Sequence, residues 1–262
     1  MTDDEIPLSG GNVNAGVCRI GNTVRRNPAP SSHSIHSLLQ HLEAKGFVGS
    51  PRFLGYDEKN REILSFLEGQ VGILTFAWEN EESLTSAAQL LRQYHDYTID
   101  FRADINNWAF VYPDVTKHEV ICHNDFGLYN LVYAEKRAVG IIDFDLAGPG
   151  PRLRDVAYAA YWLTPLSLNS ADQIPYAEKD LANESRRLKL LCSKYGVPPT
   201  TELIEMIEAV LWQMGDEEHI RRMIGDQATE KLMAEEHLSH WRREAEVFHK
   251  NKWRIINNIP NK

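Results

Sequence analysis

Cysteine is scarce in this sequence, and the few cysteines argue against two kinds of site. The three are Cys18, Cys122 and Cys192, and no Cys-x-x-Cys pair occurs. An odd number of widely spaced cysteines predicts neither a disulfide framework nor a zinc site, and it indicates a reducing compartment. The first residues lack the basic and apolar runs of a targeting signal, and no stretch approaches the length of a membrane span. We therefore expect a cytoplasmic protein that does not act in a membrane.

Positive charge is also in deficit. The chain has 28 Lys and Arg against 37 Asp and Glu, which gives a net charge of -9. This balance argues against nucleic acid or an anionic membrane as a partner, and it is weakly compatible with a cationic substrate. The remaining composition, 43% hydrophobic and 25% charged over 262 residues, is typical of a globular protein with a large core.

The candidate chemistry lies between residues 119 and 143. Three short apolar runs rich in valine and isoleucine bracket two polar segments, which predicts buried strands joined by a loop and a tight turn. Asp125 falls in the loop, Asn130 at the start of the next strand, and Asp143 at the end of the strand after that. Oxygen ligands such as Asn130 and Asp143 suit Mg²⁺, which needs few protein atoms when phosphates complete its shell. Asp125 would then orient an acceptor hydroxyl and take its proton.

The pattern His123-x-Asp125-x-x-x-x-Asn130, followed by Ile142-Asp143-Phe144, resembles the catalytic and metal loops of the protein-kinase-like superfamily. The lack of an arginine after His123, and the sequence from Asp143 to residue 158, are similar to the aminoglycoside phosphotransferase and choline kinase branch of the superfamily. The resemblance covers residues 8 to 165. It implies an α+β fold of two lobes, with a small β-rich N-terminal lobe and a larger, mainly helical C-terminal lobe.

The same resemblance implies roles for the site residues. Asp125 and His123 would be catalytic, Asn130 and Asp143 would bind Mg²⁺, and Asp155 would brace the catalytic loop. Taken alone, His123 is better explained as a histidine that organises the loop. ATP or GTP would donate the phosphate, and the sequence does not distinguish the two.

The chain divides by composition. Residues 1–69 are expected to form a β-rich nucleotide-binding lobe with one helix, and residues 70–262 a catalytic and substrate lobe that is mainly helical. Apolar spacing and terminal glycines predict helices over residues 83–97, 176–195, 200–224 and 226–250.

Two segments of the first lobe are candidates for contact with the nucleotide. Gly10, Gly11 and Asn12 precede a hairpin predicted over residues 17–26, and glycine allows backbone N–H groups to approach phosphates closely. The resemblance places a nucleotide-covering loop there. It also places the hinge between the lobes at Phe66 to Glu68, where backbone groups would hold the purine.

The resemblance expects a lysine on the second strand of that hairpin, where this chain has Arg25 and Arg26. Neighbours in a strand face opposite sides, so only one of them points into the cleft. Alignment favours Arg25, and the alternative is that both are exposed edge charges. The family helix that follows usually supplies a glutamate to pair with this cation. The matching region, residues 34–37, has none, and the first acid of the helix, Glu43, lies in its last turn, so the expected ion pair is absent.

The sequence therefore favours a small-molecule kinase that transfers the γ-phosphate of ATP or GTP to a hydroxyl of an aminoglycoside-, sugar- or choline-like acceptor. The alternative is a non-catalytic nucleotide-binding or immunity-type protein that retains the fold. A protein kinase is disfavoured, because no activation segment is evident between Asp143 and Asp155.

Overall fold

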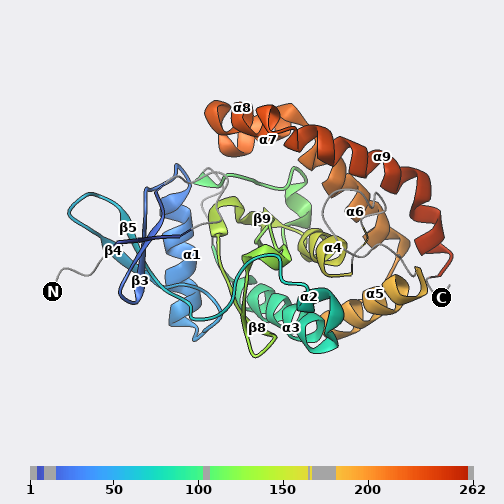
Figure 1. Ribbon diagram of the computed structural model, residues 1–262, viewed down its shortest axis with the longest axis horizontal. Helices are drawn as coiled ribbons and strands as arrows, with labels where there is room; N and C mark the ends of the chain where they lie inside the picture. Colours follow the sequence, from blue (N-terminus) through green and yellow to red (C-terminus); the bar gives the residue numbers. More distant parts are fainter. Residues whose placement is uncertain (1–4, 9–15, 103–106, 165, 167–180, 259–262) are drawn as a thin grey trace.

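The computed structural model describes residues 5–8, 16–102, 107–164, 166 and 181–258. An antiparallel sheet and one helix form one end of the molecule, and most of the helices form the other (Figure 1). Two small antiparallel sheets lie between them. Buried side chains from both ends belong to one continuous hydrophobic core, so the site between the two ends is held by a single packed unit.

The N-terminal sheet has five strands in the spatial order β1 (Ile6–Pro7), β2 (Cys18–Ile20), β3 (Thr23–Arg26), β5 (Glu62–Ser65) and β4 (Phe53–Tyr56). The hairpin predicted over residues 17–26 is present as β2 and β3. In the register between β3 and β5, Arg26 lies opposite Glu62 and Arg25 lies opposite Ile63. Directly opposed residues share a face of the sheet, so the two arginines project to opposite sides.

Helix α1 (Ser32–Ala44) covers one face of this sheet. Ile35, Leu38, Leu39 and Leu42 are at most 1% exposed, as their helical spacing predicts. They pack in the same core as Leu64 of β5.

The connection to the helical part is short and closely packed. Gly69 has φ +153°, and a Cβ atom there would lie 2.7 Å from the carbonyl oxygen of Tyr133. The next residue, Gln70, exchanges two backbone hydrogen bonds of 2.8 Å with Tyr133. Glycine is therefore required where the chain passes from the sheet to the helices.

The middle of the molecule is built on helix α3 (Glu81–Thr98), which follows the short α2 (Phe76–Glu79). The β7–β8 hairpin (Leu131–Ala134 and Arg137–Ile141) packs on α3, and β6 (Val120–Cys122) pairs with β9 (Gly148–Gly150). Single 3-10 turns lie at Val115–Lys117, Leu128–Asn130 and Phe144–Leu146. Both polar segments of the motif thus sit where these strands end.

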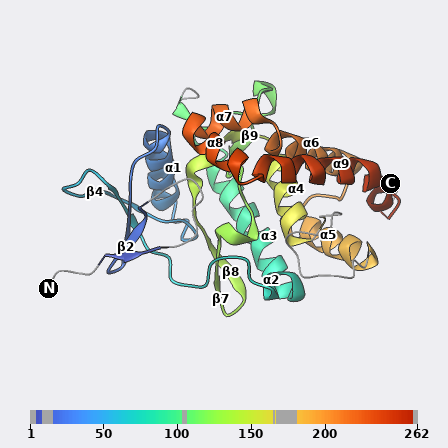
Figure 2. The ribbon, with the colours of Figure 1, turned by 45° about the horizontal axis from the view of Figure 1, so that its top comes forward.

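The C-terminal helices are α4 (Arg152–Leu163), α5 (Leu181–Tyr195), α6 (Thr201–Met214), α7 (Glu217–Ile224), α8 (Asp226–Ala234) and α9 (His237–Ile256). Helices α7 and α8 project from α6 and α9 toward the N-terminal end (Figure 2).

Two of the helices predicted from the sequence are each divided into two helices in the structure. The one predicted over 200–224 breaks after Gly215, because Asp216 caps a new helix by accepting a hydrogen bond from the backbone N–H of His219 at 2.7 Å. The one predicted over 226–250 breaks at Glu236, whose backbone is left-handed with φ +57°.

No helix within the part of the chain that the structure describes is long and apolar enough to cross a membrane. The three cysteines are buried free thiols.

Substitution of Gly148 in β9 tests the packing that holds the site. A Cβ atom at Gly148 would lie 1.8 Å from the backbone carbonyl oxygen of Phe110, which cannot move without shifting its segment. We expect Gly148→Ala to lower the free energy of unfolding by about 2 kcal/mol or more in denaturant titrations. Gly140→Ala is the control, because there the nearest atom is the end of the flexible Leu67 side chain, at 2.8 Å. Equal losses in the two variants would contradict this account.

Candidate active site

Asp125 lies in the loop after β6, and other side chains hold both of its carboxylate oxygens. The Tyr129 hydroxyl donates to Oδ1 at 2.5 Å, and the Asn130 amide nitrogen donates to Oδ2 at 2.8 Å. The Tyr129 oxygen is also 2.7 Å from the hydroxyl of Tyr158 on α4. Burial raises the pKa of Asp125, and the hydrogen bonds from Tyr129 and Asn130 act against that rise. The side chain is half-buried, so a hydroxyl group can reach a fixed carboxylate.

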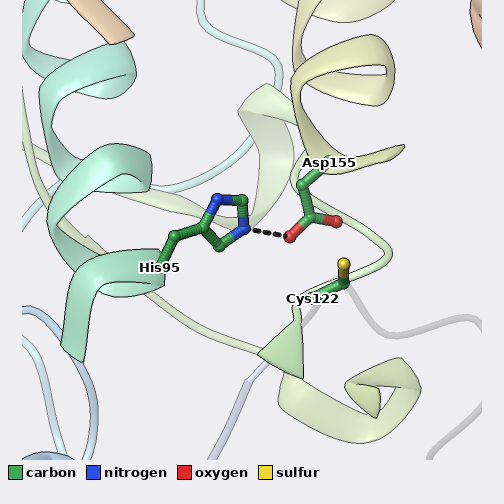
Figure 3. A group of neighbouring side chains, drawn as sticks. All are labelled: His95, Cys122 and Asp155. Carbon is green, nitrogen blue, oxygen red and sulfur yellow. Dashed lines mark hydrogen bonds and ion pairs between the residues drawn. The ribbon is translucent and has the colours of Figure 1, made fainter. Parts of the chain in front are cut away.

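The loop that carries Asp125 is braced by Asp155 of α4, as the sequence predicts. Asp155 is 0% exposed, and its two oxygens accept the backbone N–H groups of His123 at 2.6 Å and of Asn124 at 2.8 Å. Nε2 of His95 is 3.0 Å from Oδ2 of Asp155 (Figure 3). Burial opposes the charge of Asp155, but the hydrogen bonds from His95 and from the backbone N–H of His123 outweigh it and lower the pKa.

His95, Cys122 and Asp155 also meet the geometric requirement for a metal site, since their ligand atoms lie within 4.8 Å of one another (Figure 3). Hydrogen bonds already use these atoms. Cys122 Sγ donates to the carbonyl oxygen of Pro151 at 3.2 Å, and burial raises the thiol pKa well above its usual value. A metal would need the thiolate and would displace the N–H groups from Asp155, so the cluster is a structural brace.

The structure places His123 where it organises the loop, and the catalytic role that the resemblance implies stays a prediction. The ring is 0% exposed and packs edge-to-face on Phe144, with ring centroids 4.8 Å apart. Its Nε2 donates to the carbonyl oxygen of Ile142 at 3.0 Å. Burial lowers the pKa of His123 and favours the neutral ring. The buried ring ties the Asp125 loop to the residue before Asp143.

Asn130 and Asp143 lie side by side. The backbone N–H of Ile142 donates to the carbonyl oxygen of Asn130 at 2.9 Å. The amide nitrogen of Asn130 is committed to Asp125, so its amide oxygen is the atom suited to a cation. Asp143 has a left-handed backbone, with φ +63°, and such conformations collect at functional sites.

The electrostatics around Asp143 favour a bound cation. Solvent reaches its side chain, but the surrounding protein atoms, together with the Asp145 and Asp125 carboxylates, raise its pKa to about 7. Water screens part of this repulsion at an exposed group. A divalent cation would relieve the rest and allow all three carboxylates to be ionised. The oxygens of Asn130 and Asp143, from one amide and one carboxylate, are ligands that Mg²⁺ accepts.

Arg26, not Arg25, is the arginine that faces this acidic group, which corrects the alignment. Arg26 is 7% exposed, and its NH1 pairs with Oδ1 of Asp145 at 2.7 Å. Arg25 faces the other side of the sheet, where its Nε lies 3.7 Å from Asp57. The physical reason is the strand register, which sets Arg26 rather than Arg25 on the side of the sheet that faces Asp145.

The other candidate nucleotide-binding residues lie away from these contacts or outside the described residues. Gly10, Gly11 and Asn12 fall outside the described residues. Glu68 is exposed and pairs with Arg19 at 2.6 Å, and the Arg19 guanidinium lies 3.7 Å from the centroid of the Phe66 ring. Their proposed role as the purine-binding hinge stays a prediction.

Sequence reasoning missed three residues of the site. Tyr129 is the residue before Asn130, and its bond to Asp125 has no signature in the motif. Asp145 lies two residues after Asp143, where an acid is equally explained by a helix cap or a surface charge. Glu62, which pairs with Arg26 at 2.7 Å, is separated from it by 36 residues, and only the register of β3 with β5 brings the two together.

Comparison with known proteins gives one family. Residues 99–191 match the Phosphotransferase enzyme family. The trifolitoxin immunity protein of Rhizobium leguminosarum bv. trifolii is 33% identical over 201 residues, which cover 74% of this chain and 75% of that protein.

Solved structures share the fold at low identity. The gentamicin complex of APH(2″)-IIa has a TM-score of 0.59 over 94% of each chain, at 14% identity. A choline/ethanolamine kinase family protein from Mesorhizobium loti has 0.52, over 94% of this chain and 92% of that one, at 14% identity. The GDP complex of wild-type aminoglycoside 2′-phosphotransferase-IIIa has 0.53, over 96% and 94%, at 13% identity. The predicted two-lobe α+β fold of the protein-kinase-like superfamily is thereby confirmed.

Replacement of Asp155 tests the brace of the loop. Asp155→Asn leaves a backbone N–H group facing an amide N–H, so we expect a loss of about 3 kcal/mol in the free energy of unfolding at pH 7. Because the folded pKa of Asp155 lies below its usual 3.8, the carboxylate stabilises the fold above about pH 4, and this contribution is lost as the pH falls through the folded value. The gap between wild type and variant should therefore shrink in acid.

The matched control for that measurement is Asp96→Asn. Asp96 also carries a lowered pKa and pairs with Arg92 and Arg152, but its side chain is 39% exposed. We expect a change of less than about 1 kcal/mol. A gap for Asp155→Asn that persists unchanged to pH 2, or that is no larger than that of the control, would contradict the brace.

Proposed function

Because this chain belongs to the phosphotransferase enzyme family, the aminoglycoside phosphotransferase and choline kinase branch of the protein-kinase-like superfamily, we propose that it transfers the γ-phosphate of ATP or GTP to a hydroxyl of a small molecule. The observation that carries the proposal is the convergence of Asp125, Asn130 and Asp143 at the ends of neighbouring strands. Under this proposal the nucleotide lies between residues 1–69 and residues 70–262.

Asp125 would act on the acceptor. A carboxylate held at both oxygens has one orientation, and an acceptor hydroxyl that hydrogen bonds to it is aligned for attack on the phosphorus atom. As the bond from oxygen to phosphorus forms and the bond to the nucleoside diphosphate breaks, the hydroxyl proton passes to Asp125. Tyr129 and Asn130 would keep the carboxylate in place while its charge changes.

Asn130 and Asp143 would hold the metal, and Arg26 would face the phosphates. A bound Mg²⁺ would offset the negative charge of the phosphate oxygens during transfer. The acidic group around Asp143 supports this role, since it combines oxygen ligands with a carboxylate that strongly resists ionisation alone. Arg26 would add a fixed positive charge on the opposite side of the group.

The acceptor class is the least determined part of the proposal. Aminoglycoside-, sugar- and choline-like alcohols all remain candidates, because a likeness of fold at 12–14% identity does not select a substrate. The excess of acidic residues, with a net charge of -9, gives weak support to a cationic acceptor.

A second candidate function is immunity without catalysis. It is favoured by the relative that is named as a trifolitoxin immunity protein, because the match covers 75% of that protein. In that case the chain would bind nucleotide, or a toxic ligand, without transferring phosphate. The retention of Asp125, Asn130 and Asp143 in one site supports the kinase as the first candidate.

Removal of the proposed base tests the transfer. Asp125→Asn keeps the shape of the side chain but cannot take a proton, so we expect turnover to fall by about 100-fold or more while nucleotide affinity is retained. The measurement is nucleoside diphosphate release across a panel of hydroxylated acceptors. Asp96→Asn is the control and should keep wild-type turnover. Wild-type turnover in Asp125→Asn would refute the assignment.

A test of metal-dependent nucleotide binding distinguishes both candidate functions from a site that no longer binds nucleotide. We expect ATP or GTP with Mg²⁺ to raise the melting temperature of the wild type, because a ligand that binds only the folded state stabilises it. The shift should be absent without Mg²⁺ and in Asp143→Ala. A metal-dependent shift without transfer to any acceptor would favour the immunity protein, and no shift under any condition would exclude a nucleotide-binding site.

A further inference from the structure

The helix glutamate that the family uses to hold its strand cation is missing, yet the cation of this chain is held. We propose that Glu62 of β5 is the positioning residue for Arg26, and that it takes the place of the helix glutamate in fixing this arginine at the phosphate site. The inference rests on the proposed function, because it assigns Arg26 to the nucleotide phosphates.

Two carboxylates bind separate nitrogens of the Arg26 guanidinium group. Its Nε donates to Oε2 of Glu62 at 2.7 Å, and its NH1 pairs with Oδ1 of Asp145 at 2.7 Å. Burial disfavours its charge, but the Asp145 and Glu62 carboxylates outweigh that cost and raise its pKa. The guanidinium is planar and rigid, so fixing Nε fixes the direction of both terminal nitrogens.

Glu62 is in turn fixed by helix α1. It is 0% exposed, and its second oxygen, Oε1, receives the Ser32 hydroxyl and lies 2.9 Å from Nε2 of His36. Ser32 and His36 are one helical turn apart and therefore share a face of α1. The His36 ring stacks on Phe53 of β4, with centroids 3.5 Å apart. The acid thus comes from the strand and its hydrogen-bond donors from the helix, which reverses the arrangement that the family resemblance implies.

The two partners of Arg26 differ in their exposure. The Glu62 side chain is fully buried, whereas that of Asp145 is 19% exposed and lies two residues from Asp143. Phosphate oxygens entering this group can therefore take over NH1 from Asp145 while Glu62 keeps Nε. Glu62 would hold the arginine in both states, and Asp145 would exchange with the phosphates.

The experiment compares Glu62→Gln with Asp57→Asn, which removes the acid facing Arg25 on the other side of the sheet. We expect Glu62→Gln to raise the KM for nucleotide, and the Kd of a fluorescent nucleotide analogue with Mg²⁺, by about tenfold or more, since hydrogen bonds to charged groups are strong. The kcat at saturating nucleotide should change less than KM. Asp57→Asn should leave both constants at the wild-type value.

A double-mutant cycle distinguishes positioning from a general loss of stability. In an Arg26→Lys background the fork geometry is already gone, so Glu62→Gln should add little to KM, whereas a purely structural defect would add in full. Arg25→Lys is the control for Arg26→Lys and should bind nucleotide normally. If Glu62→Gln does not fold, Ser32→Ala, which removes one donor to Glu62, should raise KM to a smaller extent.

The outcomes separate this inference from the proposed function. The inference would be overturned, and the kinase assignment left intact, if Glu62→Gln keeps the turnover, the KM and the Kd of the wild type. The same conclusion would follow from Ser32→Ala if that variant is the one that folds. Absence of transfer in the wild type would overturn the kinase assignment, while the binding constants would still test the inference. A lower melting temperature with an unchanged KM in Glu62→Gln would show that Glu62 is only structural. Effects on KM that add in full in the cycle would show the same.

Discussion

The buried Asp155 carboxylate is the interaction on which the rest of the site depends. It accepts two consecutive backbone N–H groups, and this fixes Asn124 in a left-handed conformation with φ +65°. That conformation turns the chain so that the side chain of the next residue, Asp125, is half-buried, whereas those of Asn124 and Phe126 are buried. A non-glycine residue with such a backbone costs roughly 1–3 kcal/mol and persists only where surrounding bonds determine it. Arg154 supplies another such bond, from its Nε to Asn124 Oδ1 at 2.8 Å.

The same loop connects to the metal-ligand segment. The amide nitrogen of Asn124 donates to the carbonyl oxygen of Leu146 at 2.8 Å, and His123 donates to Ile142. These two bonds lie on either side of Asp143 in the sequence. A displacement of the Asp125 loop would therefore carry Asp143 with it, so the proposed base and the proposed metal ligand form one rigid unit rather than two independent loops. The strain at Asn124 and Asp143 is thus held by a common network.

The sequence predicts the elements of this site better than the contacts between its distant parts. Asp125, Asn130 and Asp143 fall at strand ends that apolar runs reveal, and Asp155 follows from the motif. The break after Gly215 also had a signal, since a glycine followed by a capping aspartate ends one helix and starts another. The choice between Arg25 and Arg26 had no local signal. It depends on which residue of β5 lies opposite, and a register shift of one residue exchanges the two faces of a strand.

Under the proposed function, the charges of the site explain why a divalent cation and Arg26 would be needed together. Asp125, Asp143 and Asp145 are close enough that the first and third raise the pKa of the second. A nucleotide triphosphate would add further negative charge at the same place, and free nucleotide would be repelled. Arg26 offsets part of this charge, but it is already shared between Glu62 and Asp145. Under the proposed function, the acidic group therefore selects a nucleotide that arrives with a divalent cation. Arg26 contributes to phosphate binding more through the fixed orientation of its guanidinium group than through its net charge.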